Sequence, residues 1–399
     1  MNEGDDCMRN RIEQLDSIRG LAAVTVVFGH ILLVSEIPVL SAMTSIYSPL
    51  SIITNGHSAV MMFFLLSGFV LSLPFLKGRN IPYGAFIIKR FFRIYIPYVC
   101  SIISAIVLYS LISGGGITSL SEWFNISWND PITVKSIVEH LLLIGNFNSD
   151  LYNNVIWSLI HEMRISILFP LLAILLVKFN WKIVVGMCIG LSVISGMNSL
   201  IPIDPSIGYR TSYMESIHFI SIFLIGGLIA KHREALQNIY NNFSRKMKWL
   251  LILVGFILYT YSGFVGLIGS ALGLSVYYDI IKDYTSVAGA AIFLVFALGS
   301  KKASFVLLYK PIKVLGKLSY SLYLYHLIVL FSLIYILHEV LSLGLIYIMT
   351  LIISIILSAL SYRFIEVSSI TIGRNLTSKS QKNLIEGSVV QKSNPVEHI

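Results

Sequence analysis

Ten apolar segments, each of about the length that crosses a bilayer as a helix, constrain the fold of this 399-residue chain most strongly. A membrane span must satisfy its backbone hydrogen bonds internally, and an apolar segment of about 20 residues does so as a helix. We therefore predict an all-α fold, a polytopic transmembrane helix bundle. The expected spans are 18–36, 58–76, 94–113, 157–178, 182–199, 215–230, 249–265, 284–300, 318–338 and 343–362.

The charge distribution predicts the orientation of the bundle. Hydrophobic residues make up 56% of the chain and charged residues 12%, which excludes an ordinary soluble domain. With a cytoplasmic N-terminus, 24 of the 29 Lys and Arg residues fall on the inner side, as the positive-inside rule requires. An eleventh span at 266–280 would place the basic segment 301–317 on the outer side of the membrane, so we do not expect one. The net charge of +9 is explained by this topology and by the anionic inner leaflet, and no nucleic-acid partner is predicted.

The chain is predicted to have three parts. Residues 1–17 are expected to be a cytoplasmic N-terminus, 18–368 the transmembrane domain, and 369–399 a disordered cytoplasmic tail. The first segment follows an acidic start and lacks a cleavage site, so we expect it to be retained as an anchor. The three cysteines show no metal or disulfide spacing, and no metal site is predicted. The expected location is the inner (plasma) membrane of the cell, as a multi-pass protein in contact with the lipid bilayer.

Arg19 and His30 lie eleven positions apart in the first apolar segment. Eleven residues turn an α-helix through about 1100°, roughly 20° beyond three turns, so both side chains point to one side about 16 Å apart. A charged side chain within a membrane costs at least about 2.5 kcal/mol and usually faces a polar cavity. We therefore expect this helix to line a cavity. The alternative is that Arg19 marks the cytoplasmic border and His30 is a satisfied interior histidine.

The second span contains Ser67-Gly68, and the following loop leads to Arg90 and Arg93. Small residues such as Ser67 and Gly68 allow close helix packing, which is one interpretation of this pair. The alternative interpretation is that Ser67 contacts the substrate directly. Arg90 and Arg93 are one turn apart at the inner surface. Two guanidinium groups on one face suit a phosphate ligand from the cytoplasm, whereas anchoring to lipid headgroups would explain the same spacing.

Three ionisable residues, His161, Glu162 and Arg164, fall within four positions of the fourth span. Helical rise places Glu162 about 10 Å below the outer surface, near the depth of His30. We therefore predict that His30 and Glu162 meet in a cavity near the middle of the membrane. The alternative is a structural ion pair of Glu162 with Arg164 or with Arg19.

The ninth span begins with a run of serines and tyrosines that leads to His326. Ser319, Tyr323 and His326 follow one another at four and three positions and so share a helix face. This face is a candidate part of the same site. An aromatic belt at the membrane surface is the alternative reading of the tyrosines.

Together these motifs resemble the acyltransferase-3 family of integral membrane acyltransferases, over about residues 12–368. Many members carry a Phe-Tyr pair where this chain has Ile165-Ser166, which concerns the acceptor side. The chain resembles the stand-alone members, in which no esterase-like domain follows. The motifs that carry the resemblance are Asp16-x-x-Arg19-Gly-Leu-Ala with His30 beyond it, Phe63-Phe64-x-x-Ser67-Gly68-Phe69, Arg90-x-x-Arg93, Trp157-Ser158-Leu159-x-x-Glu162, Ser319-Tyr320-Ser321-Leu322-Tyr323-Leu324-x-His326, and Tyr362-x-x-Ile365-Glu366.

The resemblance implies O-acylation, usually O-acetylation, of a surface carbohydrate such as O-antigen, capsule or exopolysaccharide. The implied donor is acyl-CoA, usually acetyl-CoA, from the cytoplasm, and the acceptor is a carbohydrate or a lipid-linked saccharide. In this scheme Arg90 and Arg93 hold the CoA phosphates, and Arg19 adds a contact or guides the pantetheine arm.

The resemblance also suggests roles at the reacting centre. His30 would act as general base on the acceptor hydroxyl or briefly carry the acyl group, and the sequence leaves both open. Glu162 would orient His30 or bind the acceptor. The sequence does not identify the residue that stabilises the oxyanion; Ser67 and Tyr323 are candidates, with Ser319 and His326 as supporting residues.

Two further functions compete with this one. A lipid or a small secondary metabolite is the alternative acceptor. A secondary transporter or flippase is the alternative from another class, but the halves of the chain show no repeat and the arginine pair suggests no transport role. The outside loop 114–156 is expected to set acceptor choice.

Overall fold

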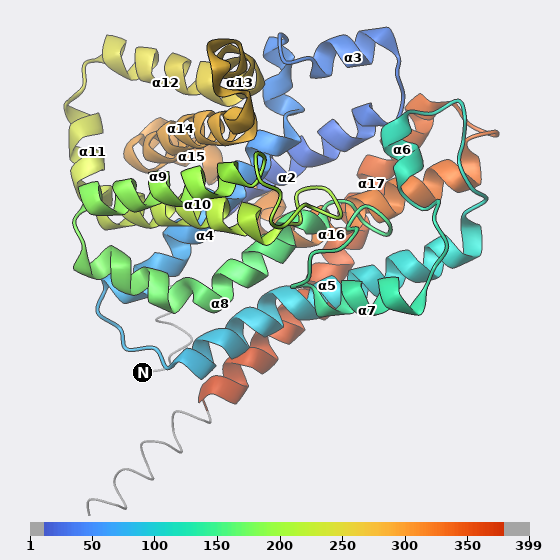
Figure 1. Ribbon diagram of the computed structural model, residues 1–399, viewed down its shortest axis with the longest axis horizontal. Helices are drawn as coiled ribbons and strands as arrows, with labels where there is room; N and C mark the ends of the chain where they lie inside the picture. Colours follow the sequence, from blue (N-terminus) through green and yellow to red (C-terminus); the bar gives the residue numbers. More distant parts are fainter. Residues whose placement is uncertain (1–11, 379–399) are drawn as a thin grey trace, which may run out of the picture.

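A computed structural model describes residues 12–378, and every regular element in this range is a helix (Figure 1). The predicted all-α membrane bundle is confirmed. Eight helices are long and apolar enough to cross a membrane. They are α2 (Glu13–Leu33), α4 (Gly56–Leu76), α5 (Tyr83–Ile112), α8 (Ile156–Lys178), α10 (Tyr213–Lys231), the helix Ser262–Gly299 that ends as α14 (Tyr278–Gly299), α16 (Lys310–Leu337) and the helix Leu343–Ser378 that begins as α17 (Leu343–Ser361).

The other two predicted spans are shorter helices. The segment 182–199 forms α9 (Trp181–Met197), with 17 residues. The segment 249–265 is interrupted at Tyr261, because α12 (Arg245–Thr260) ends after 16 residues and α13 (Ser262–Gly269) follows. Seventeen residues rise about 26 Å, less than the hydrocarbon thickness of about 30 Å. The structure therefore supports eight full-length spans and leaves α9 and α12 as shorter helices of the bundle.

The disordered tail was predicted to begin at residue 369, but the chain is helical beyond that point. Helix continues from α17 through the π-helical turn η4 (Tyr362–Glu366) as far as Ser378. Ser369 and Thr377 are buried in this extension, and their hydroxyls donate to the carbonyls of Glu366 and Gly373. Local bonds and burial thus hold a segment whose composition suggested disorder. Residues 1–11 and 379–399 lie outside the described residues, so the cytoplasmic location of both ends stays a prediction.

Short helices connect the long ones. The segment 266–280 is not a separate helix; it runs from α13 through the turns η2 (Ser270–Leu274) and η3 (Ser275–Tyr277) into α14. The outside loop 114–156 carries two short helices, α6 (Glu122–Ile126) and α7 (Val134–Leu142). α7 lies beside α5 in Figure 1, and Phe124 of α6 packs on Phe331 of α16. The other short helices are α3 (Pro38–Thr44), η1 (Pro49–Ile53), α11 (Arg233–Asn242) and α15 (Lys301–Leu307).

A glycine pair sets the contact between α2 and α16. A Cβ on Gly20 would lie 2.5 Å from the Gly316 nitrogen, and a Cβ on Gly316 would lie 2.5 Å from the Asp16 carbonyl oxygen. At this crossing only glycine leaves room for the facing backbone. The two helices run in the same direction, since Glu13 at the start of α2 pairs with Lys313 at the start of α16 at 2.8 Å.

Candidate functional site

His30 and His326 meet across the contact between α2 and α16. Nδ1 of His30 lies 2.9 Å from Nε2 of His326, and Nδ1 of His326 lies 2.9 Å from the Leu322 carbonyl oxygen. A carbonyl only accepts, so Nδ1 of His326 carries the proton and its Nε2 accepts from His30. This chain of bonds assigns the tautomer of His30, with a proton on Nδ1 and a lone pair on Nε2. Nε2 of His30 is therefore the basic nitrogen, and Nδ1 is held by its hydrogen bond to His326.

The glycine pair explains why these histidines meet. His30 follows Gly20 by ten residues, and His326 follows Gly316 by ten residues. Because the helices are parallel and touch at the glycines, equal steps of about 15 Å bring both side chains to the same height. The sequence contained this signal as an equal spacing in two segments. Sequence reasoning used His326 only as a supporting residue and missed it as the partner of His30.

Tyr323 joins this histidine pair to α8. Its ring centroid lies 6.2 Å from that of His326, and its hydroxyl lies 2.7 Å from Ser158 Oγ and 2.9 Å from the Val155 carbonyl oxygen. Glu162 follows Ser158 by four residues, so both are on one face of α8. A polar strip thus runs from the histidine pair through Tyr323 towards Glu162.

Glu162 pairs with Arg90 and does not contact His30. Arg90 Nη2 donates to Glu162 Oε1 at 2.7 Å and Arg90 Nε donates to Ser166 Oγ at 3.0 Å, while Ser67 Oγ donates to the same Glu162 oxygen at 3.3 Å. Among residues 12–378 no hydrogen bond or ion pair joins Glu162 to His30, so the prediction that the two meet was wrong. Depth along a helix gives the height of a side chain but not its direction around the axis. His326 occupies the orienting position that was expected for Glu162.

The two arginines expected to hold phosphates are in different environments. Arg90 is buried, with 8% of its surface exposed, because α5 begins at Tyr83 and this arginine faces α8 inside the bundle. Arg93 is exposed, and within residues 12–378 its guanidinium has no hydrogen-bond or ion-pair partner. The predicted surface pair is thus one buried structural arginine and one available arginine.

Arg19 lies beside this group, as the eleven-residue spacing from His30 required. Its Nη1 is 3.5 Å from Asp16 Oδ1, and its side chain is largely buried. It also lies close enough to interact electrostatically with Arg93, Glu162 and Arg90. Three guanidinium groups therefore gather here with the carboxylates of Asp16 and Glu162.

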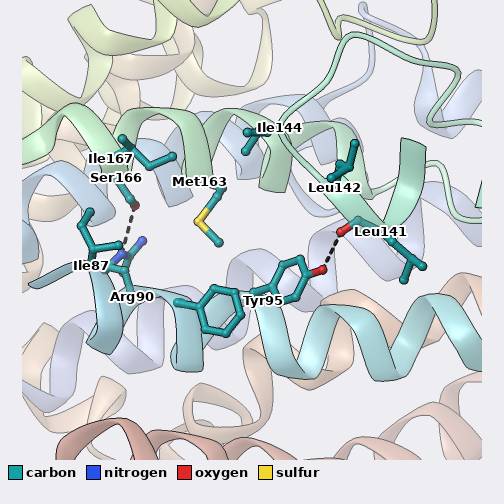
Figure 2. Close-up of a pocket in the computed structure, with 10 residues that line it drawn as sticks. Ile87, Arg90, Tyr95, Leu141, Leu142, Ile144, Met163, Ser166 and Ile167 are labelled. Atoms are coloured by element: carbon teal, nitrogen blue, oxygen red, sulfur yellow. Dashed lines mark hydrogen bonds between the residues drawn. The ribbon is translucent and has the colours of Figure 1, made fainter. Parts of the chain in front are cut away.

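A pocket of about 270 Å³ lies beside Arg90, between α5, α7 and α8 (Figure 2). Arg90 and Ser166 form its polar end, and Met163 and other apolar side chains line the rest. Tyr95 closes one side by donating its hydroxyl proton to the Leu141 carbonyl at 2.6 Å. His30 and His326 are not among the lining residues. The pocket therefore exposes the Arg90 end of the strip and not the histidine end.

The remaining predicted residues have structural contacts. Ser319 Oγ donates to the Gly316 carbonyl at 2.9 Å, beside the glycine contact. Gly68 packs directly on the Phe223 backbone of α10, as the packing interpretation expected, whereas the Ser67 hydroxyl contacts Glu162. Arg164 donates to backbone carbonyls of the outer loops, among them Gly145 at 2.7 Å, so it forms no pair with Glu162.

Sequence reasoning missed a second buried polar cluster, which we call the Asp283 cluster. His57 Nε2 lies 2.5 Å from Asp283 Oδ1, His218 Nε2 lies 3.2 Å from Asp283 Oδ2, and Arg210 Nη2 lies 2.7 Å from the same Oδ2. Arg210 also donates to Glu215 at 2.8 Å. Burial alone would lower the pKa of Arg210, but the carboxylates of Asp283 and Glu215 raise it well above its usual value. In the sequence His57, Arg210 and Asp283 lie at or beyond the ends of apolar segments, where a charge is ordinary, and His218 is an isolated histidine within the predicted span 215–230.

Comparison with known proteins identifies the family. A family described as an acyltransferase domain matches residues 12–362. Peptidoglycan O-acetyltransferase OatA of Listeria monocytogenes is 23% identical over 396 aligned residues, covering 90% of this chain. The chain spans 56% of that relative's length. No solved structure matches it. The family match favours acyl transfer over transport, and the chain belongs to the acyltransferase-3 family of integral membrane acyltransferases.

Proposed function

We propose that the protein is an O-acetyltransferase that moves an acetyl group from cytoplasmic acetyl-CoA to a hydroxyl of an envelope carbohydrate. The observation that carries the proposal is His30, whose Nε2 lone pair is free while its Nδ1 proton is held by His326. Family membership supports acyl transfer, and the relative named a peptidoglycan O-acetyltransferase supports a glycan acceptor such as peptidoglycan, O-antigen, capsule or exopolysaccharide.

His30 acts as the general base in this scheme. Its Nε2 removes the proton of the sugar hydroxyl as the oxygen attacks the thioester carbonyl. The C–S bond of the tetrahedral intermediate then breaks, and the imidazolium returns the proton to the thiolate of CoA. His326 accepts the hydrogen bond from Nδ1 throughout, so it keeps the ring oriented and stabilises the positive charge that His30 carries between the two proton transfers.

The donor site lies at the arginine end of the strip. Arg93, which is exposed, and neighbouring Arg19 contact the phosphates of CoA through charge-assisted hydrogen bonds. Arg90 instead forms an ion pair with Glu162 and fixes the position of that carboxylate in the site. Replacing Arg93 by Ala should raise KM for acetyl-CoA about tenfold with little change in acceptor KM, measured in membrane vesicles. An unchanged acetyl-CoA KM would exclude Arg93 from donor binding.

The deciding experiment compares envelope glycans of the host carrying wild-type protein or His30→Ala. Proton NMR of the purified polysaccharides and of peptidoglycan should show one acetyl signal that the variant loses and a wild-type copy restores. Immunoblotting of membranes checks that the variant is present at normal level. Identical glycan spectra, with both proteins present, would contradict a glycan acceptor; a change confined to extracted lipids or metabolites would assign the acceptor to those classes.

A further inference from the structure

Trp123 of α6 covers the reactive histidine from the side of the outside loop. Its ring centroid lies 5.4 Å from that of His30, with 11° between the planes. The indole is partly exposed, and its Nε1 has no hydrogen-bond partner among residues 12–378. Trp128 in the same loop is fully buried, and its Nε1 donates to the Tyr152 carbonyl at 2.9 Å. The two tryptophans therefore differ. Trp128 is buried and its donor is bonded, whereas Trp123, whose ring also lies 6.0 Å from that of Phe331, is partly exposed and keeps a donor without a partner.

The helix that carries Trp123 is fixed to the helices that carry the histidines. Ser121 Oγ donates to the Leu33 carbonyl at 2.5 Å and Ser121 N donates to the Val34 carbonyl at 3.0 Å, which ties α6 to the end of α2. Phe124 is fully buried, with its ring 5.3 Å from that of Phe331 on α16. These contacts on both helices hold the indole in a constant position relative to His30.

We propose that Trp123 is the acceptor-positioning residue, a platform on which a sugar ring of the acceptor stacks so that its hydroxyl reaches Nε2 of His30. This inference rests on the proposed function. The flat carbon–hydrogen face of a pyranose packs on an indole face, and the Nε1 proton is free for one sugar oxygen. Rigid placement lowers the entropy cost of bringing the hydroxyl to the base. The outside loop thereby contributes to acceptor choice, as its position in the sequence suggested.

The test uses full-length protein in membrane vesicles, with acetyl-CoA and oligosaccharides released from the host envelope by glycosidase digestion. Trp123→Ala should raise acceptor KM about tenfold, the loss of one aromatic contact and one hydrogen bond. KM for acetyl-CoA should stay within about twofold. Trp123→Phe should recover part of the acceptor affinity, because it restores a ring without the donor. Ile126→Ala is the matched control, since Ile126 is an exposed residue of the same helix and should leave both constants unchanged.

The outcomes separate this inference from the proposed function. An unchanged acceptor KM in Trp123→Ala overturns the platform. A fall in kcat with both KM values unchanged also overturns it, because Trp123 would then only pack against His30. If wild-type protein acetylates none of the oligosaccharides, or if His30→Ala retains activity, the proposed function fails first. A raised acceptor KM together with inactive His30→Ala supports both.

Discussion

Within residues 12–378, two pairs of histidines lie inside the helix bundle and are built in opposite ways. His30 and His326 bond to one another, and no carboxylate among residues 12–378 contacts either ring. His57 and His218 do not bond to one another; each donates from Nε2 to one oxygen of Asp283, which Arg210 also contacts. Aromatic residues lie between the two regions, where Phe64 packs 4.9 Å from Phe219 and 6.3 Å from Trp157.

In the proposed function, this difference separates a catalytic base from a structural anchor. At Asp283 every carboxylate oxygen is occupied and the guanidinium of Arg210 balances the charge, so the protons on both Nε2 atoms are fixed. His57 Nδ1 also lacks a partner among residues 12–378, but that atom is buried. His30 likewise has one nitrogen fixed by a hydrogen bond, but it is partly exposed and its other nitrogen keeps a lone pair. A single neutral partner therefore orients a base, whereas a shared carboxylate makes a structural anchor.

The comparison is tested most strongly by equivalent substitutions in the two pairs. His30→Ala should lower kcat for acetyl transfer about 10³-fold, within the range for loss of a general base. His57→Ala should leave kcat within about threefold, because Asp283 keeps Arg210 and His218 as partners. Both are measured on purified protein at matched folded concentration. Equal losses in the two variants would mean that the Asp283 cluster also takes part in the chemistry.

The second prediction concerns stability. Replacing Asp283 by Asn leaves the buried guanidinium of Arg210 with Glu215 alone and should destabilise the fold by about 3 kcal/mol. The lower unfolding temperature is measured on detergent-solubilised protein, and the specific activity of the remaining folded fraction should be unchanged. The control is Glu139→Gln, which removes an exposed ion pair with Lys135 and should change stability by less than about 0.5 kcal/mol. An equal, small effect in both variants would contradict an anchoring role for Asp283.

How far the sequence predicted these regions follows from how each is assembled. The bundle could be predicted from the apolar segments, and His30 could be selected as a candidate, because a titratable residue within an apolar segment is rare enough to be informative. The Asp283 cluster could not, because its members come from α4, α10, α14 and a loop, and each is unremarkable until the helices pack. Arg90 was placed at the surface because the apolar stretch starts at 94, whereas the helix starts at Tyr83 and carries Arg90 inside.

The third prediction tests whether His326 acts by accepting one hydrogen bond. His326→Ala removes the acceptor of the His30 Nδ1 proton and should lower kcat about tenfold without changing KM for acetyl-CoA. His326→Gln places an amide oxygen within reach of that proton and should recover part of the rate. The pH dependence of kcat should also move in His326→Ala, since the partner of the base is gone. A variant with wild-type kcat and pH profile would remove His326 from the mechanism.

A third kind of buried histidine gives the smallest predicted effect. His140 of α7 has a single partner, the Ser136 carbonyl 2.7 Å from its Nδ1, and its Nε2 is buried without one. Burial lowers the pKa of His140 from 6.5 to about 4, although the Ser136 bond raises it. The native state therefore holds this histidine neutral, and the unfolded state binds the proton more tightly. Its contribution to stability is present above pH 6.5 and is lost as the pH falls towards 4.

Between pH 7 and 5.5 this loss should amount to about 1 kcal/mol. The quantity to measure is the difference in pH dependence of unfolding between wild-type protein and His140→Phe, because the phenylalanine fills the space beside Phe147 and Tyr152 and binds no proton. The variant should lose less stability than the wild type on acidification. Identical pH dependence would show that His140 is protonated without cost, and that burial without a carboxylate does not by itself keep a histidine of this protein neutral.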